Sequence, residues 1–141
     1  MQLLVDADCL IAGTLAPSGA CSRLLDLWQA GEFELIVCPN LVDEVRRGLL
    51  HPRIAGKYNI SETEVDQLAR RLLDESLYFE DPIDPPRVVA DDPNDDYLVA
   101  VAIEASADHF VTRDRHFDKV QVEGLTIVPP RHALKIIEGR A

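Results

Sequence analysis

The chain alternates between short apolar runs and longer segments in which apolar residues recur with helical spacing. The short runs indicate buried strands, and the periodic segments indicate helices with one apolar face. Strands that alternate with helices are typical of a parallel sheet that is covered on both faces. The runs predict strands at 3–5, 34–37, 109–112 and 126–128, and the periodic segments predict helices at 22–28, 40–50, 61–77, 95–105 and 131–137.

Three of the predicted helices have a recognisable start. Ser61, with Glu64 three residues later, fits a capping box, in which each side chain bonds the backbone N–H of the other residue. Asn40 can cap the helix that it opens. Asp95 or Asp96 can cap the apolar helix that follows them.

The chain has the length of one domain. At 141 residues it can bury about two-thirds of the surface that the unfolded chain exposes, so it needs no disulfide or structural metal to fold. Prolines and glycines interrupt the chain on both sides of 59–78, which is interpreted as a helical insertion between sheet elements. Since no repeat or linker marks a second domain, we expect 1–141 to be a single domain.

Composition and charge narrow the class of protein. A hydrophobic content of 47% is typical of a globular domain and excludes a disordered chain. The formal net charge of −11 excludes broad electrostatic binding of nucleic acid unless cations or a local basic rim reverse the sign. The cysteines lack metal-ligand spacing, and no stretch is apolar enough to span a membrane. We therefore expect a cytoplasmic protein with no membrane contact.

Acidic residues stand where a parallel sheet binds its ligands. Asp6 directly follows the first predicted strand, and Asp114 follows the strand at 109–112. In an open parallel sheet, this position points into the crevice beyond the carboxyl ends of the strands. Other acids that could reach the same edge are Glu44, on the first turns of a helix, and Asp91, Asp92, Asp95 and Asp96, before the next one.

Acids that converge repel one another, which raises their pKa values, and a divalent cation removes this cost. Because the ligand atoms are oxygens, the pattern implies Mg²⁺ or Mn²⁺. Taken singly, each acid also has an ordinary structural explanation. Asp95 or Asp96 can be only a helix cap, Glu44 can be solvated, and Asp6 and Asp8 can cap a helix that follows them.

Four segments carry a family resemblance: LLVDADCLIAG at 3–13, NLVDEVRRGLL at 40–50, DDPNDDYLVAVAIEASADHFVTRDRHF at 91–117 and TIVPPRHAL at 126–134. Together they resemble the PIN domain family, the PilT N-terminal ribonuclease fold that includes the toxins of many bacterial toxin-antitoxin pairs. The third segment is the most specific, because it joins an acid-rich helix start, an alanine-rich helix, a strand and a terminal Thr-Arg-Asp. The resemblance implies a three-layer α/β/α fold with a central, mostly parallel sheet of about five strands.

The resemblance also implies which acids form the site. The four acids of the family correspond to Asp6, Glu44, Asp95 and Asp114, with Asp96 as the alternative to Asp95 in an alignment shifted by one. Asp6, Asp95 and Asp114 are expected to hold Mg²⁺ or Mn²⁺. Glu44 is expected to hold a second ion or to orient the attacking water.

Three further positions lie near these acids. Thr112 matches a recurring hydroxyl position of the family that could orient a carboxylate or a metal-bound water. Asp8 stands where the family usually has asparagine, which adds an anion and could change the metal preference. His116 stands where many relatives have a further acid. The histidines show no ligand spacing and are predicted to be non-catalytic, although His116 could contact a phosphate.

The function implied by the resemblance is that of a metal-dependent ribonuclease, which hydrolyses RNA phosphodiester bonds and leaves 5′-phosphate and 3′-hydroxyl ends. Arg47 and Arg115 are the candidates for contacts with phosphate, unless they only pair with surface acids. The likeness to toxins further implies a cognate antitoxin protein, and the family implies a homodimer.

A phosphatase of the haloacid dehalogenase type is one alternative. Asp6 would be its nucleophile and Asp8 its acid/base, and Asp91, Asp92 and Asp96 would imitate its later acidic motif. This alternative leaves the Thr-Arg-Asp sequence unexplained, and the chain has no lysine at the end of a strand before the second acidic cluster.

A binding module is the other alternative. A receiver-like phosphoacceptor would need a lysine after its last strand, where this chain has Pro129 and Pro130. A catalytically inactive PIN fold is harder to exclude. The presence of an acid at every matched position favours an active enzyme over it.

Overall fold

The computed structural model describes residues 1–89 and 93–139. Its centre is a five-stranded sheet with the order β3-β2-β1-β4-β5, in which every neighbouring pair of strands is parallel. The strands are β1 (Gln2–Val5), β2 (Glu34–Val37), β3 (Leu77–Tyr78), β4 (His109–Val111) and β5 (Ile127–Val128). The expected parallel sheet of about five strands is confirmed.

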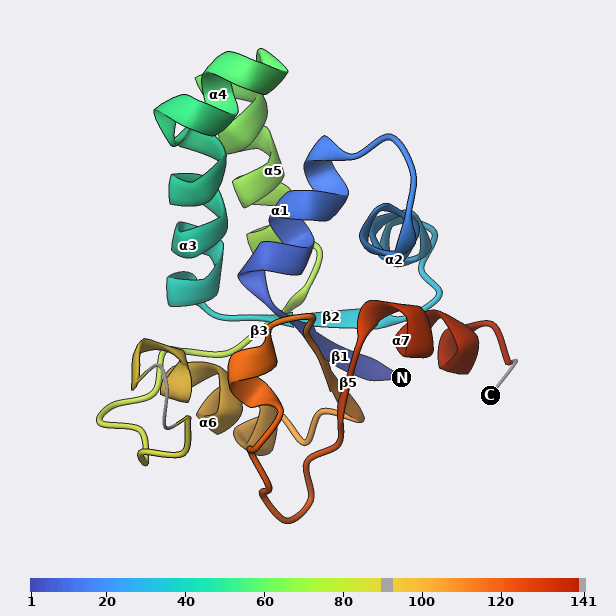
Figure 1. Ribbon diagram of the computed structural model, residues 1–141, viewed down its shortest axis with the longest axis vertical. Coiled ribbons are helices and arrows are strands. Elements are labelled where there is room, and N and C mark those ends of the chain that lie inside the picture. The colour runs from blue at the N-terminus through green and yellow to red at the C-terminus, as the bar shows by residue number, and fades with distance from the viewer. Residues whose placement is uncertain (90–92, 140–141) are drawn as a thin grey trace.

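Helices cover both faces of this sheet. In the described part of the chain they are α1 (Ala7–Leu15), α2 (Ala20–Gln29), α3 (Pro39–Leu50), α4 (Pro52–Tyr58), α5 (Glu62–Asp74), α6 (Asp96–Glu104) and α7 (Pro130–Ile137). Figure 1 shows α1, α2, α3 and α5 on one side of the sheet and α6 on the other, which gives the expected three-layer α/β/α fold. None of these helices is long and apolar enough to cross a membrane.

The first strand lies in the middle of the sheet because its residues are apolar on both faces. Leu3, Leu4 and Val5 are all buried. Leu3 pairs with Leu35 on one side and with His109 on the other. Successive side chains of a strand point to opposite faces, so an unbroken apolar run is what a strand between two helical layers requires.

The segment 59–78 differs from its expected helical insertion at its C-terminal end. α5 ends at Asp74, whereas the sequence predicted a helix over 61–77. Leu77 and Tyr78 instead form β3, which pairs with the end of β2. A strand of two residues is too short to show a hydrophobic pattern of its own. Its extended conformation is decided by pairing with the neighbouring strand, so the sequence could not predict it.

The helix starts were predicted with mixed success. The helix start at Ser61 is confirmed: the Glu64 N–H donates to Ser61 Oγ at 3.1 Å, as in a capping box, while Glu64 Oε1 accepts from the Ser61 hydroxyl at 3.2 Å in place of its backbone N–H. Asp95 occupies the N-cap position of α6. Asn40 was wrong as a cap, because α3 begins one residue earlier, at Pro39, with Cys38 at the N-cap position. Proline suits the first turn, where its missing N–H would have no helical partner.

Aromatic packing holds the segment that follows β4. Phe117 is buried, and its ring meets that of Phe110 edge to face, with 4.9 Å between the ring centroids and an angle of 90° between their planes. Phe110 lies in β4 itself, between β1 and β5. The chain between these two rings is therefore held at the carboxyl end of the sheet, close to the end of β1.

Candidate metal centre

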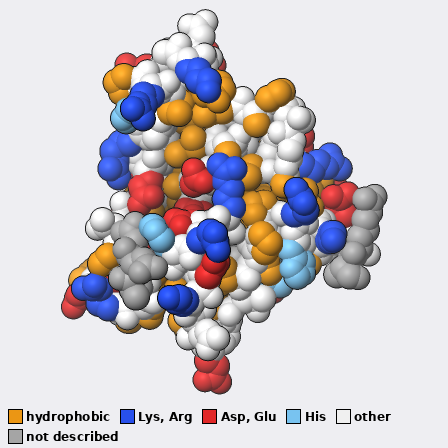
Figure 2. All heavy atoms as spheres, viewed as in Figure 1, with side chains coloured by type: hydrophobic (Ala, Val, Ile, Leu, Met, Phe, Trp, Pro, Cys, Tyr) orange, Lys and Arg blue, Asp and Glu red, His pale blue; other side chains and the backbone are white. Residues whose placement is uncertain are grey.

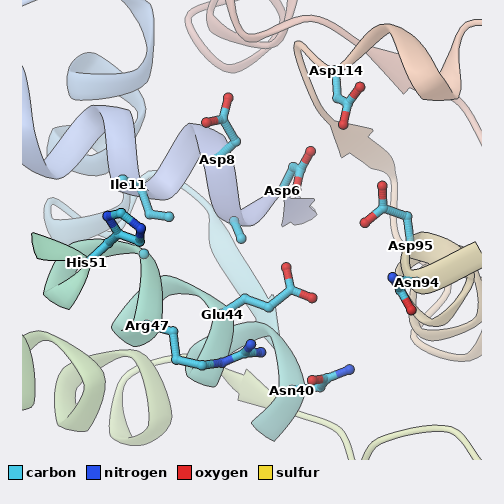
Figure 3. Close-up of a pocket in the computed structure, with 12 residues that line it drawn as sticks. Asp6, Asp8, Ile11, Asn40, Glu44, Arg47, His51, Asn94, Asp95 and Asp114 are labelled. Atoms are coloured by element: carbon cyan, nitrogen blue, oxygen red, sulfur yellow. The ribbon is translucent and has the colours of Figure 1, made fainter. Parts of the chain in front are cut away.

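A cleft of about 770 Å³ opens at the carboxyl ends of β1 and β4. Acidic side chains lie together near the middle of this face, and basic side chains lie around them (Figure 2). Figure 3 shows the carboxylates of Asp6, Glu44, Asp95 and Asp114 directed toward a common space. The structure thus brings together, from four separate segments, the four acids that the resemblance assigned to the site.

Asp6 is the most buried of these acids, with 7% of its surface exposed. It leaves β1 directly, its N–H donates to the Val111 carbonyl at 2.9 Å, and it occupies the N-cap position of α1 without a capping hydrogen bond from its side chain. Burial raises the pKa of Asp6, and the negative charges of Asp114 and Asp8 raise it further, whereas a hydrogen bond from Thr112 lowers it. Burial therefore contributes more to this shift than the repulsion that the sequence suggested.

Thr112 links two of the acids. Its hydroxyl donates to Asp6 Oδ2 at 2.8 Å and accepts from the Asp114 N–H at 3.0 Å. A hydroxyl has a single proton, which the bond to Asp6 uses. The buried Thr112 side chain therefore holds the Asp6 carboxylate and the backbone of Asp114 in one arrangement, as expected for a residue that orients a carboxylate.

Asp114 is held by the turn that follows it. Its Oδ1 atom accepts from the His116 N–H at 2.9 Å, and the residue caps the short 3₁₀ helix Arg115–Phe117. The Asp114 side chain remains partly exposed at the cleft. This local bond fixes the direction of the carboxylate, because it uses one oxygen and a backbone group only two residues away.

Asp95 and Asp96 have different surroundings. Asp95 lines the cleft, and its side chain makes no capping bond to α6. Asp96 is 2% exposed, and its Oδ1 accepts from the N–H groups of Val88 and Val89 at 3.0 and 2.7 Å. Arg87 completes this arrangement, with 3.3 Å between its Nε and Asp96 Oδ2. Asp96 therefore holds the chain at 87–89, and Asp95 is the residue that can reach a metal ion with the other acids.

Glu44 faces the cleft from the second turn of α3. The Tyr97 hydroxyl donates to its Oε1 atom at 2.8 Å. Burial, and then the negative charge of Glu44, raise the pKa of Tyr97, so the phenol keeps the proton that it donates. Tyr97 was not singled out from the sequence, where it counted only as part of an apolar helix.

The two candidate arginines occupy different places. Arg47 lines the cleft, and its Nε lies 2.9 Å from Asp43 Oδ2. The Arg115 side chain is 92% exposed, pairs with Asp118, and is not among the residues that line the cleft. Arg47 is therefore the better placed of the two for a contact with a bound phosphate.

The arrangement does not favour a haloacid dehalogenase-type phosphatase. Asp8, its proposed acid/base, is ion-paired with Arg113 at 2.8 Å. Asp96, part of its later acidic motif, is turned to the backbone at 87–89. Asp91 and Asp92, the other acids of that motif, lie outside the described residues.

Two histidines lie at or near the cleft, although the sequence predicted that both are non-catalytic. His51 lines the cleft, and it also accepts from the Arg53 N–H at 3.3 Å at the start of α4. His116 lies beside Asp114, with 3.5 Å between His116 Nδ1 and Asp114 Oδ1. The sequence had marked His116 by its place two residues after Asp114, and the structure puts it on the turn that Asp114 caps.

The residues at the cleft fit a divalent cation of the Mg²⁺ or Mn²⁺ type. Carboxylate oxygens are the ligands that these hard cations prefer. Among the described residues, no Lys or Arg lies within ion-pair distance of the nearly buried Asp6. A buried carboxylate without a cation is costly, and an ion held by Asp6, Asp95 and Asp114 would remove that cost.

The raised pKa of Asp6 gives an expected pH dependence. Between its ordinary pKa of 3.8 and its higher pKa in the fold, the folded protein binds more protons at Asp6 than the unfolded chain does. Asp6 therefore makes the metal-free fold more stable as the pH falls from 7 toward 3.8. Asp6→Asn carries no charge at this position at any pH, so it should be more stable than the wild type at pH 7. It should also lack the increase in stability that Asp6 gives the wild type as the pH falls.

Urea unfolding in EDTA at several pH values measures this contribution as the difference between wild type and Asp6→Asn. Taking the difference cancels the titration of the other acids. A difference that does not change with pH would contradict the burial of a charged Asp6.

Comparisons with known proteins identify the family of this chain. Residues 2–116 match the PIN domain family. The chain is similar to the crystal structure of PAE2754 from Pyrobaculum aerophilum, with a TM-score of 0.65 and 19% identity over 99% of this chain and 90% of that one. It is also similar to the crystal structure of FitAcB from Neisseria gonorrhoeae, with a TM-score of 0.51 and 20% identity over 92% of this chain and 99% of that one. A comparison with curated proteins finds no match. Because the family match spans most of its length, the chain belongs to the PIN domain family.

Proposed function

We propose that this protein is a divalent-metal-dependent ribonuclease and the toxin component of a toxin-antitoxin pair. The observation that carries the proposal is the convergence of Asp6, Glu44, Asp95 and Asp114 in one cleft. These acids come from different elements, so their meeting is a property of the fold and not of one acidic segment. Membership of the PIN domain family, whose members are generally nucleases, supports the same function.

Each acid has a role in this proposal. Asp6, Asp95 and Asp114 hold the cation, and Glu44 faces them from α3, where it orients the attacking water or holds a second ion. When bound, a divalent cation offsets the charge of the phosphodiester and makes a water molecule a stronger nucleophile. Thr112 acts through Asp6, because its hydroxyl fixes the direction of that carboxylate. Tyr97 acts in the same way on Glu44.

RNA is the proposed substrate. The cleft is open and lined by polar and charged side chains, with Arg47 on its wall for a contact with the backbone phosphate. Arg115 stands further out and is proposed as a contact with a neighbouring phosphate. The exposed tyrosines among the described residues, Tyr58 and Tyr78, do not line the cleft, so base stacking contributes little there. We therefore propose recognition of RNA by shape, with weak readout of sequence.

The proposed partner is a cognate antitoxin protein. A ribonuclease of this kind would damage its own cell, and the family resemblance to toxins supplies the precedent for a separate inhibitor. The acidic cleft and the net charge of −11 favour a partner segment with Arg or Lys that enters the cleft and displaces the cation. A homodimer and a cytoplasmic location belong to the same proposal.

Cleavage of RNA by the purified protein tests this function. We expect cleavage in Mg²⁺ or Mn²⁺, products with 5′-phosphate and 3′-hydroxyl ends, and complete loss of cleavage in excess EDTA. Cleavage that continues in EDTA would contradict the role of the metal. Metal binding without any cleavage would favour the inactive PIN fold that only binds other proteins.

A further inference from the structure

His116 lies with the acids of the cleft, although it is not an acid. One ligand atom each from Asp95, Asp114 and His116 can be chosen so that all three lie within 4.8 Å of one another. His116 Nδ1 is 3.5 Å from Asp114 Oδ1. The imidazole side chain is 47% exposed, so solvent and an incoming ion can both reach it.

The fold holds His116 at this point. The backbone N–H of His116 donates to Asp114 Oδ1 at 2.9 Å, and the next residue, Phe117, is buried against Phe110. One end of the turn is therefore fixed by an acid of the cleft and the other by the hydrophobic core. The imidazole is placed by the backbone and needs only a side-chain rotation to change its distance from the acids.

The spacing of these atoms suits one ion. In an octahedral site with bonds of about 2.1 Å, neighbouring ligand atoms are about 3 Å apart and opposite ones about 4.2 Å apart. The 3.5 Å between His116 Nδ1 and Asp114 Oδ1 is close to the distance between neighbouring ligand atoms. The ligand atoms of Asp95, Asp114 and His116 all lie within 4.8 Å of one another, which is close to the distance between opposite ligand atoms. Small rotations of these side chains can close both differences.

We propose that His116 is a ligand of the same cation as Asp95 and Asp114, and that its nitrogen makes the site prefer Mn²⁺ or Co²⁺ over Mg²⁺. The proposal rests on the proposed function, because it concerns the ion of that site. Imidazole nitrogen suits transition metals, whereas Mg²⁺ prefers oxygen ligands and gains little from nitrogen. The preference would then be set by one residue of this chain.

Electron paramagnetic resonance of Mn²⁺ tests the contact directly. We expect coupling of Mn²⁺ to a nitrogen nucleus in the wild-type protein, loss of that coupling in His116→Ala, and no change in His132→Ala. His132 is the matched control because it is an exposed histidine on α7. Alanine keeps the backbone N–H that bonds Asp114, so His116→Ala should keep the turn.

Calorimetry of metal binding tests the preference. His116→Ala should weaken Co²⁺ binding by about tenfold or more, since even residues that only orient a ligand change metal affinity by about 10- to 100-fold. Binding of Mg²⁺ should change much less. His116→Asp, which supplies an oxygen ligand in place of the nitrogen, should shift the preference from Co²⁺ toward Mg²⁺ relative to the wild-type protein.

The outcomes separate this inference from the proposed function. Mn²⁺ that binds without coupling to nitrogen would overturn the role of His116 and leave the carboxylate site intact. Equal loss of Mg²⁺ and Co²⁺ affinity in His116→Ala would overturn the preference. Absence of Mn²⁺ binding in the wild-type protein would overturn the proposed function itself.

Discussion

Replacement of Asp114 by asparagine is expected to slow RNA cleavage by at least about a hundredfold, the effect that loss of one preorganised electrostatic group has on many enzymes. Asparagine keeps the size of the side chain and an oxygen that can accept from the His116 N–H, so the turn should remain. It removes the negative charge that would hold the cation beside Asp6 and Asp95. The measurement is the initial rate of cleavage in saturating Mn²⁺, with the melting temperature taken alongside.

Asp118→Asn is the matched control for this substitution. Asp118 follows the same short turn, but its side chain is 64% exposed and pairs with Arg115 outside the cleft. We expect its rate to be essentially that of the wild type. Full activity of Asp114→Asn would show that the charge of Asp114 is not needed for the reaction. Loss of activity in both variants would show that any change of charge at this turn lowers the rate, so the effect would not be specific to the cleft.

The positions of Asp6 and Asp114 could be predicted from the sequence because of a simple rule of topology. Asp6 directly follows β1, Asp114 lies three residues after the end of β4, and the carboxyl ends of parallel strands meet at one edge of a sheet. The neighbouring pair Asp95 and Asp96 could not be resolved in this way. Side chains of consecutive residues near a helix start point about 100° apart, so only one of the two can face the cleft. Asp96 faces away from it, because its carboxylate accepts hydrogen bonds from the N–H groups of Val88 and Val89.

Short elements that depend on a neighbour were the ones that the sequence could not predict. The two residues of β3 take an extended conformation because β2 offers free backbone groups beside them. His116 joins the acids only because Asp114 and Phe117 hold the turn at both ends. In both cases a contact from outside the segment, with β2 or with Phe110, helps to decide the conformation.

Asp95→Asn and Asp96→Asn are expected to have opposite effects, although the two residues are adjacent. Mn²⁺ at about a hundredfold excess over Kd should stabilise the wild-type protein by about 2.7 kcal/mol, which is roughly 5 to 10 °C for a chain of this length. Asp95→Asn should lose most of this increment. Asp96→Asn should keep the increment and lower the stability of the metal-free protein by about 1–2 kcal/mol, because two backbone N–H groups lose a charged acceptor.

Thermal unfolding with and without Mn²⁺ distinguishes the roles of the two residues. The melting temperature without the ion measures the stability of the fold, and its shift with the ion measures metal binding. The reverse result, in which Asp96→Asn loses the Mn²⁺ increment, would make Asp96 the ligand and would require the bonds to Val88 and Val89 to break when the ion binds. A wild-type melting temperature that ignores millimolar Mn²⁺ would contradict a common site for the acids. Since Asp6, Asp95 and Asp114 are held by three different elements, a shared ion would stabilise all three together.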